Sequence, residues 1–504
     1  MNHPTHQWSN IFEWRNRLTE MKEQCGLKRS IDWKHGFFIA IGIPLAILPT
    51  LGYTVSFLWA ASILLWGMSV IQGFLQNMAF GELATAFPNA SGIPGFAQEI
   101  FKTKDSAKHK YDRGKLIGGF CAWAYWFVWA PGLAIFIILI GSYLQGLFPA
   151  LAAMDSLTIN LILGLFILGG LAVVASRGLK CSARLGLIIA IFTIIPITVI
   201  VLAPFATGDF HVENITNSLV PTDWTWDGDH VMLILGLMVI AQWSACCWEV
   251  VAVYGPEYKK PSSDVPKALF ACGIFCLIMY VLIQAAVIGT LGVNGVLEQP
   301  ISPLQPVANI AFGAIGASVV ILLLVGAIIL LIQIGYSAAA RAMHSMSLEG
   351  NLPRWFAKTN SKGEPMRAVI VIAIVNMFLI FLGSPVAILA ASAIAYVFAF
   401  AIGLFAYVKA KRDPVLRAME RPYKAPRGWV WVALALGIMQ IPLLLVGALY
   451  INNLSYGLVP TVVGFGALGL FFPLWVYSQH ESHKQREREL KGSEGESKAE
   501  VEAS

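Results

Sequence analysis

The stretch that decides the fold reads Val231-Met-Leu-Ile-Leu-Gly-Leu-Met-Val-Ile-Ala-Gln-Trp-Ser-Ala-Cys-Cys-Trp-Glu249-Val-Val-Ala-Val-Tyr254. It is long and apolar enough to cross a bilayer as a helix, yet it carries one acid, Glu249, and no Lys or Arg to neutralise it. A carboxylate at bilayer depth costs several kcal/mol unless it meets water, a partner or a cationic ligand. Glu249 is therefore predicted to be a functional residue.

The composition of the whole chain agrees with a membrane location. Of its 504 residues 57% are hydrophobic and 13% are charged, whereas soluble domains carry about 25% charged residues. The first 30 residues are polar and charged, so we expect no cleavable signal peptide. The sequence predicts an all-α membrane protein with twelve transmembrane helices, at about 35–52, 56–80, 117–147, 157–176, 183–205, 230–254, 267–291, 316–342, 367–383, 386–409, 429–451 and 457–478.

The basic residues predict the orientation of these helices. If both termini lie on one side, all 35 Lys and Arg fall on that side, and the six opposite loops carry only acids such as Asp155, Asp209 and Glu298. The positive-inside rule then places the N and C termini in the cytoplasm of a multi-pass protein of the cell inner membrane. The net charge of +6 thus reflects topology and does not imply a nucleic-acid partner. The seven Cys of the chain are expected to be reduced thiols.

Two tails flank one membrane domain, residues 35–478. The N-terminal tail, 1–34, is predicted to be cytoplasmic, and its Trp8, Ile11, Trp14 and Leu18 recur at roughly helical spacing. This pattern favours a short interfacial helix, with a solvated tail as the alternative. Residues 479–504 are rich in Glu, Ser and Lys and are predicted to form a disordered cytoplasmic tail.

Helix-breaking residues interrupt the first and sixth predicted helices at mid-depth. Helix 1 contains Gly42-Ile43-Pro44 and Pro49, and proline removes an N–H and clashes with the preceding turn. Helix 6 contains Ser244-Ala245-Cys246-Cys247 just before Glu249. Interrupted helices at corresponding positions of two halves are typical of a transporter site between inverted repeats. The alternative is that these prolines are merely tolerated, as they often are in membrane helices.

Four motifs occur in order along the chain. They are Glu82-Leu-Ala-Thr-Ala-Phe-Pro-Asn-Ala-Ser-Gly92, Trp248-Glu249 with Gly255-Pro-Glu257 and Asp264-Val-Pro266, Arg341 to Pro353, and Gly363-Glu-Pro365-Met-Arg367. Together with the twelve predicted spans, they resemble permeases of the amino acid–polyamine–organocation (APC) superfamily over most of the chain. Glu82, near the inner end of helix 2, is more simply a structural residue.

The resemblance implies a LeuT-like fold of 5+5 helices in an inverted repeat. Repeat one would cover about 35–205, repeat two about 230–409, and two peripheral helices about 429–478. Substrate would lie between the broken helices 1 and 6. The implied substrate-binding residues are Gly42, Ile43, Pro44, Trp243, Ser244, Ala245, Cys247, Trp248 and Glu249, with Trp243 at the place of an aromatic gate.

Helix 1 departs from the family pattern, which usually reads G-S-G-I-F where this chain has Gly42-Ile43-Pro44. In the family, backbone N–H groups of that link hold the substrate carboxylate. Pro44 has no N–H and Ile43 has no hydroxyl, so the anion site is expected to be small or absent. We therefore expect a cation-rich substrate, namely an amine, a polyamine or a basic amino acid, with a neutral amino acid as the alternative.

A second departure concerns the coupling ion. Proton-coupled members of the family place a lysine in helix 5 where this chain has Thr193, which argues against lysine-based proton coupling. Ser337 on helix 8 is a candidate Na⁺ ligand, although small polar residues also serve simply in helix packing. Na⁺, H⁺ and exchange without a coupling ion therefore all remain open, and no cofactor is expected.

The leading hypothesis is a secondary active transporter, either a permease or an exchanger, for an amino acid or a related organic amine. An enzyme would need His, Asp or Ser/His pairs at depth, and a channel would need a continuous polar face; neither is found in the sequence. A non-transporting sensor or assembly partner on the same fold is the remaining alternative.

For Glu249 the alternative to substrate binding is a protonated acid that braces unwound backbone. For Trp243 and Trp248 the alternative to substrate contact is a place among the tryptophans of the membrane interface. The sequence leaves the oligomeric state open.

Overall fold

The computed structural model describes residues 31–484 except residues 41, 89, 91, 103–111, 178–182, 246 and 483. Within these residues the chain is helical, and its one β-bridge joins Ile31 to Tyr258. The predicted interfacial helix of the N-terminal tail and most of the predicted C-terminal tail lie outside the described residues.

The first half of the chain contains two interrupted membrane segments and several continuous ones. Pro131 separates two helices where the sequence predicted one, and Asp112 caps the first of them through the backbone N–H of Gly114. The elements are α2 (Trp33–Ala40), η1 (Ile43–Thr50), α3 (Leu51–Leu58), η2 (Trp59–Ala61), α4 (Ser62–Ala86), α5 (Gly92–Phe101), α6 (Arg113–Trp129), α7 (Gly132–Leu147), α8 (Pro149–Ala152), α9 (Ser156–Ser176), α10 (Ala183–Thr207) and α11 (Glu213–Thr216).

The second half contains the two longest helices, and each of them bends at a glycine. Gly292 in α14 has φ 67° and Gly313 in α15 has φ 65°, a conformation that glycine adopts without strain. The elements are α12 (Gly228–Ala245), η3 (Cys247–Glu249), α13 (Val250–Val253), η4 (Gly255–Glu257), α14 (Pro261–Glu298), α15 (Leu304–Leu348), η5 (Arg354–Ala357), α16 (Met366–Ile380), α17 (Pro385–Arg412), α18 (Pro414–Arg417), α19 (Trp429–Leu443), the π-helical η6 (Leu444–Ile451), α20 (Asn452–Tyr456) and α21 (Val459–Gly469).

Eight described helical stretches are long and apolar enough to span a membrane. The first, Trp33–Ala86, is 54 residues long and covers the first two predicted helices. Three shorter apolar helices, Ile194–Thr207, Gly228–Ser244 and Met366–Ile380, overlap three further predicted segments. The chain is therefore an all-helical, multi-pass membrane protein.

The boundary between the first two predicted helices lies further along the chain than expected. The sequence placed it near residues 53–55, whereas α3 continues to Leu58 and the chain turns at Trp59, whose φ is 49°. The expected position was wrong because residues 53–58 contain no helix breaker, and the turn is fixed by a contact distant in sequence. The backbone N–H groups of Ala60 and Ala61 donate to the carbonyls of Ser218 and Leu219 in the long loop after α10.

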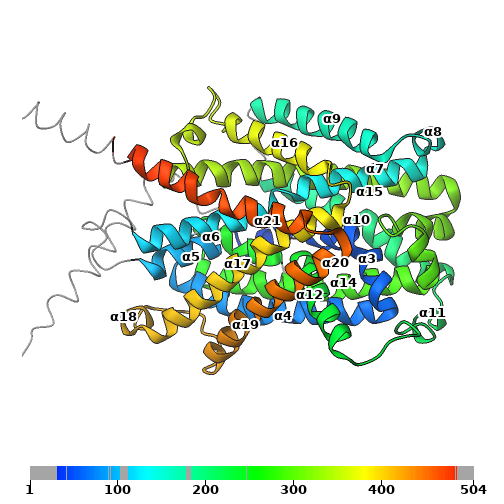
Figure 1. Cartoon of the computed structure of the whole chain (residues 1–504), viewed down its shortest axis with the longest axis horizontal. Helices are drawn as coiled ribbons and strands as arrows, with labels where there is room; N and C mark the ends of the chain where they lie inside the picture. The colour runs from blue at the N-terminus through cyan, green and yellow to red at the C-terminus, as the bar shows by residue number, and fades with distance from the viewer. Residues whose placement is uncertain are drawn as a thin grey trace, which may run out of the picture.

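The helices form a bundle with a buried centre and an exposed periphery. Figure 1 shows α9 and α16 along one edge and α19 along the other, with α5 and α18 at one end and α8 and α11 at the opposite end. In α17 most side chains are buried, as they are in α6 and α7, whereas few side chains of α9 are. α4 packs against α14 and α12, and α17 packs against α6 and α19. These contacts place α4, α6, α12, α14 and α17 around the candidate site.

Glu82 in α4 is a buried acid with a full set of partners. Its Oε1 accepts hydrogen bonds from Lys411 Nζ and Arg421 Nη1, each at 2.9 Å. Its Oε2 accepts from the hydroxyl of Tyr407 at 2.8 Å and from the backbone N–H of Ala425 at 3.0 Å. The carboxylate thus fastens the end of α17 and the loop that follows it to α4.

Substitution Glu82→Gln is predicted to lower the stability of the protein markedly. It leaves the buried guanidinium of Arg421 and the half-buried ammonium of Lys411 without their counter-charge, and breaking a buried ion pair costs about 3–5 kcal/mol. Thermal unfolding of the purified protein measures the effect. Glu99→Gln is the matched control, because Glu99 pairs with Lys102 at 4.0 Å near the surface and should contribute no more than about 1 kcal/mol. Equal unfolding midpoints for the two variants would contradict the prediction.

Candidate functional site

The α-helical path is interrupted in the first membrane segment. After α2 ends at Ala40, residues Ile43–Thr50 form a tighter 3₁₀ helix with Pro44 in its first turn and Pro49 inside it. Because Pro44 has no N–H, the carbonyl of Ala40 four residues earlier lacks its α-helical donor. The carbonyl of Gly42 accepts from the N–H of Leu45 at 3.1 Å, three residues further on, as in a 3₁₀ turn.

The sixth predicted helix is interrupted within the tetrapeptide of residues 244–247. α12 ends at Ala245, and a short 3₁₀ turn, Cys247–Glu249, leads into α13. Cys246 and the side chains of Ala245 and Cys247 lie outside the described residues. A role for Ala245 and Cys247 in substrate binding therefore stays a prediction.

One hydroxyl joins the two interruptions. Tyr280 lies on α14, is fully buried, and packs its ring 5.8 Å from that of Trp66. Its hydroxyl lies 3.1 Å from the carbonyl oxygen of Ile43 and also contacts the carbonyl oxygen of Ser244 in a short hydrogen bond. The O–H of Tyr280 thus serves carbonyls from both broken segments. Sequence reasoning missed this residue, although a tyrosine in an apolar span needs a partner for its hydroxyl and is itself a signal.

Glu249 is buried, with 1% of its surface exposed, and the side chain of Tyr125 donates a hydrogen bond to it. Its Oε1 accepts from the hydroxyl of Tyr125 on α6 at 3.1 Å. Its Oε2 has no hydrogen-bond partner among the described residues. Glu82, by contrast, has two donors at each oxygen. Glu249 therefore keeps an acceptor oxygen available for a further donor.

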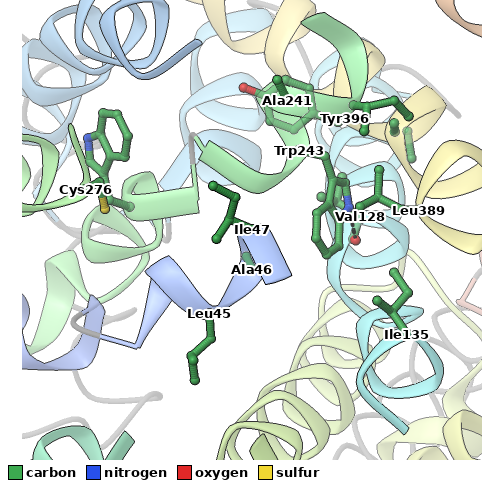
Figure 2. Close-up of a cluster of buried hydrophobic side chains, with 14 of the residues drawn as sticks. Leu45, Ala46, Ile47, Val128, Ile135, Ala241, Trp243, Cys276, Leu389 and Tyr396 are labelled. Carbon is green, nitrogen blue, oxygen red and sulfur yellow. Dashed lines mark hydrogen bonds between the residues drawn. The ribbon is translucent and has the colours of Figure 1, made fainter. Parts of the chain in front are cut away.

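A row of aromatic rings extends from Tyr125. The ring centroid of Tyr125 lies 6.1 Å from that of Trp129, which lies 5.5 Å from that of Trp243. The indole N–H of Trp243 donates to the carbonyl of Val128 at 2.9 Å. Figure 2 shows this bond and places Trp243 in a cluster with Ile47 of η1. These rings form one wall of the region around Glu249.

Trp248 lies on a different side of the break. It is fully buried, and its ring packs 5.5 Å from that of Phe74 on α4. The ring of Trp248 thus packs against α4, and its contact with substrate stays a prediction. Trp243 is 1% exposed and Trp248 is 0% exposed, so neither ring faces solvent.

The structure describes the side chain of only one of the two candidate coupling-ion residues. Ser337 is half-buried on α15, and no hydrogen bond links it to Glu249 in the described part of the chain. The side chain of Thr193 lies outside the described residues. No group of three His, Cys, Asp or Glu suited to a metal ion occurs among the residues that were described.

The chain just before α2 and the chain just after η4 are joined by two backbone hydrogen bonds. The backbone N–H of Ile31 donates to the carbonyl of Glu257 at 3.2 Å, and that of Lys259 donates to the carbonyl of Ile31 at 2.8 Å. Burial raises the pKa of the Glu257 carboxyl above its usual range, an effect that the guanidinium of Arg341 partly offsets. The segments just before α2 and just after η4 are thus coupled through backbone hydrogen bonds.

Comparison with known proteins identifies the family. The family described as "Amino acid permease" matches residues 31–470. The chain belongs to this family. Its members are permeases and exchangers, which are transporters rather than enzymes, and the expected likeness to APC permeases is confirmed.

Individual relatives are distant. An arginine/ornithine antiporter of Lactococcus lactis is 26% identical over 326 residues, covering 60% of this chain and 59% of the antiporter. An amino-acid permease of Bacillus subtilis is 26% identical over 359 residues, covering 68% of this chain and 71% of the permease. Among solved structures, a manganese transporter of Eremococcus coleocola is similar in fold, with a TM-score of 0.56 at 13% identity over 90% of this chain and 98% of that one.

Substitution Tyr280→Phe is predicted to impair transport more than it impairs folding. It keeps the ring against Trp66 but leaves the carbonyls of Ile43 and Ser244 without this donor, which costs about 1–3 kcal/mol. Uptake by the variant in proteoliposomes, together with its unfolding midpoint, measures both effects. Tyr336→Phe is the control, because that hydroxyl donates to the carbonyl of Val369, away from both breaks. If both variants transport equally well, the hydroxyl of Tyr280 does not organise the site.

Proposed function

We propose that this permease is a secondary active transporter that moves an amino acid or a related organic amine by alternating access. The proposal includes twelve spans, two inverted repeats at about residues 35–205 and 230–409, and both termini in the cytoplasm. It places the substrate between the broken segments of helices 1 and 6. Matching interruptions in two halves of a permease support this arrangement.

The observation that carries the proposal is the hydrogen bonding of Glu249. A buried carboxylate retained for stability is expected to have its oxygens satisfied, as Glu82 does. Glu249 accepts one bond from Tyr125 and keeps Oε2 without a described partner. An ammonium or guanidinium group of a substrate would supply both the missing donor and the missing charge.

The same reasoning favours a cationic substrate. Around the break in helix 1, Pro44 offers no N–H to a substrate carboxylate, while Glu249 offers an oxygen to a substrate amine. The faces of Trp129 and Trp243 would add cation–π attraction close to the same charge. The partial match to an arginine/ornithine antiporter is consistent with a basic amino acid as substrate.

In the proposed cycle the substrate cation enters a site that is open on one side and binds Glu249. Its charge then neutralises the carboxylate in a region that the aromatic rings keep free of water. The breaks at η1 and η3 act as hinges, and Tyr280 keeps them together while the outer or inner halves of the two helices move. Release on the other side restores the free Oε2.

A competition experiment tests the substrate class. Uptake of a radiolabelled basic amino acid is measured in the presence of its decarboxylated amine, and of a neutral amino acid of similar size. The proposal expects the amine to compete at least as well as the neutral amino acid. If only neutral amino acids compete, the cationic assignment fails, and transport of a neutral amino acid by the same fold takes its place.

Substitution Glu249→Gln is predicted to reduce kcat/KM for a cationic substrate by roughly 10- to 100-fold, because hydrogen bonds to charged groups contribute about 1.5–3 kcal/mol. Initial rates in proteoliposomes measure the loss. Glu298→Gln, which removes an exposed acid at the end of α14, is the charge-matched control and should transport like the unmodified protein. Unchanged transport by Glu249→Gln would assign the acid to bracing the backbone. If the folded Glu249→Gln variant loses transport of neutral and cationic substrates alike, the result does not support charge recognition by Glu249.

Coupling is tested by uptake with and without Na⁺ at fixed pH. A Na⁺ dependence that Ser337→Ala abolishes supports a sodium site on α15. Equal uptake in both salts, together with acceleration by substrate on the opposite side, supports exchange without a coupling ion. Absence of all flux for every candidate substrate would favour the sensor or assembly role instead.

A further inference from the structure

The loop between α17 and α19, residues 413–428, is held rigidly on its inner side. Arg421 is buried, and its guanidinium bonds Glu82 as well as the carbonyls of Ala410 and Leu416. The carbonyl of Tyr423 accepts from the hydroxyl of Thr85 at 3.2 Å. The loop therefore presents its outer side as a defined surface of the bundle rather than as a free connection.

The outer side of this loop is strongly basic. Four cations are exposed in the short stretch from the end of α17 to the start of α19, namely Arg412, Arg417, Lys424 and Arg427. Glu420 is the one exposed acid in the stretch, since the carboxylate of Asp413 accepts from the backbone N–H groups of Val415 and Leu416 and caps α18. The four exposed cations outnumber the two acids, so this side of the loop carries an excess of positive charge.

An aromatic residue places this surface at the edge of the bilayer. Trp431, in the first turn of α19, is 65% exposed, and the guanidinium of Arg412 lies over its ring at 5.4 Å. Further along α19, Ile438 and Ile441 are also exposed, as expected for a face that contacts acyl chains. Exposed tryptophans next to such a face mark the level of the headgroups. Figure 1 shows α18 at one end of the bundle, beside the start of α19.

We propose that Arg412, Arg417, Lys424, Arg427 and Trp431 form a basic platform that binds the headgroups of anionic phospholipids. The four cations would meet the headgroup phosphates while the ring of Trp431 and the apolar face of α19 meet the acyl chains. Basic groups next to a membrane surface are attracted to anionic lipids in this way. Because Glu82 connects the loop to α4 and α17, bound lipid stabilises the ends of both helices.

Lipid binding by the purified full-length protein tests the proposal. Phosphatidylglycerol is titrated in mixed micelles against phosphatidylcholine as the neutral lipid, and the thermal shift gives an apparent Kd. The variant Arg417→Gln/Arg427→Gln is expected to bind phosphatidylglycerol roughly tenfold more weakly than the unmodified protein. Lys358→Gln/Lys362→Gln, which removes two exposed cations from the loop before α16, is the matched control and should bind as before.

Three results would overturn the proposal. The first is equal binding of phosphatidylglycerol by the platform variant and the control variant. The second is that phosphatidylcholine stabilises the protein as much as phosphatidylglycerol does. The third is that soluble glycerol 3-phosphate at the same concentration reproduces the thermal shift. The last result would show a site for a free anion instead. Native mass spectrometry of lipid retained by each variant gives a second readout that does not depend on thermal stability.

Discussion

Backbone polar groups inside a bilayer must find partners within the protein, and two interrupted helices make this demand acute. The hydroxyl of Tyr280 meets it at the carbonyls of Ile43 and Ser244 together. A third helix, α14, thereby fixes how the first and sixth membrane segments approach each other. The position of Glu249, a few residues beyond Ser244, depends on that contact.

Two buried acids in the same molecule show how environment separates structure from function. Glu82 meets two cations, a hydroxyl and a backbone N–H, and the arrangement is complete within the chain. Glu249 meets one hydroxyl, that of Tyr125, and its second oxygen lacks a described donor. The first carboxylate holds helices together. The second has the properties expected of a group whose partner arrives from outside the protein.

The sequence predicted the all-helical class of fold and the interruptions of the first and sixth segments, because both depend on signals that are local in the chain. Apolar runs locate the membrane segments, and Pro44 and Pro49 locate the interruption of the first of them. The kinks at Gly292 and Gly313 were not predicted, since glycine in an apolar run does not by itself indicate a left-handed conformation.

Contacts between distant parts of the chain were also beyond sequence reasoning. Tyr280 and Ser244 are 36 residues apart in the sequence. Tyr125 is one of several aromatic residues that cover more than one face of α6. The sequence favoured Trp243 over Trp248 for a ligand contact, and the structure places the ring of Trp243 against Trp129 and that of Trp248 against Phe74. The choice among such residues depends on helix rotation, which the apolar pattern of a wholly buried helix does not define.

The central claim is that Glu249 binds the substrate amine directly instead of bracing the unwound backbone. A structure of the protein with a transported amine or basic amino acid bound tests it most directly, through the distance from the ligand nitrogen to Oε2 of Glu249. We expect a charge-assisted hydrogen bond of about 2.7–2.9 Å, with Oε1 still bonded to Tyr125. A ligand bound elsewhere, with Oε2 facing a backbone N–H of the broken segments, would contradict it.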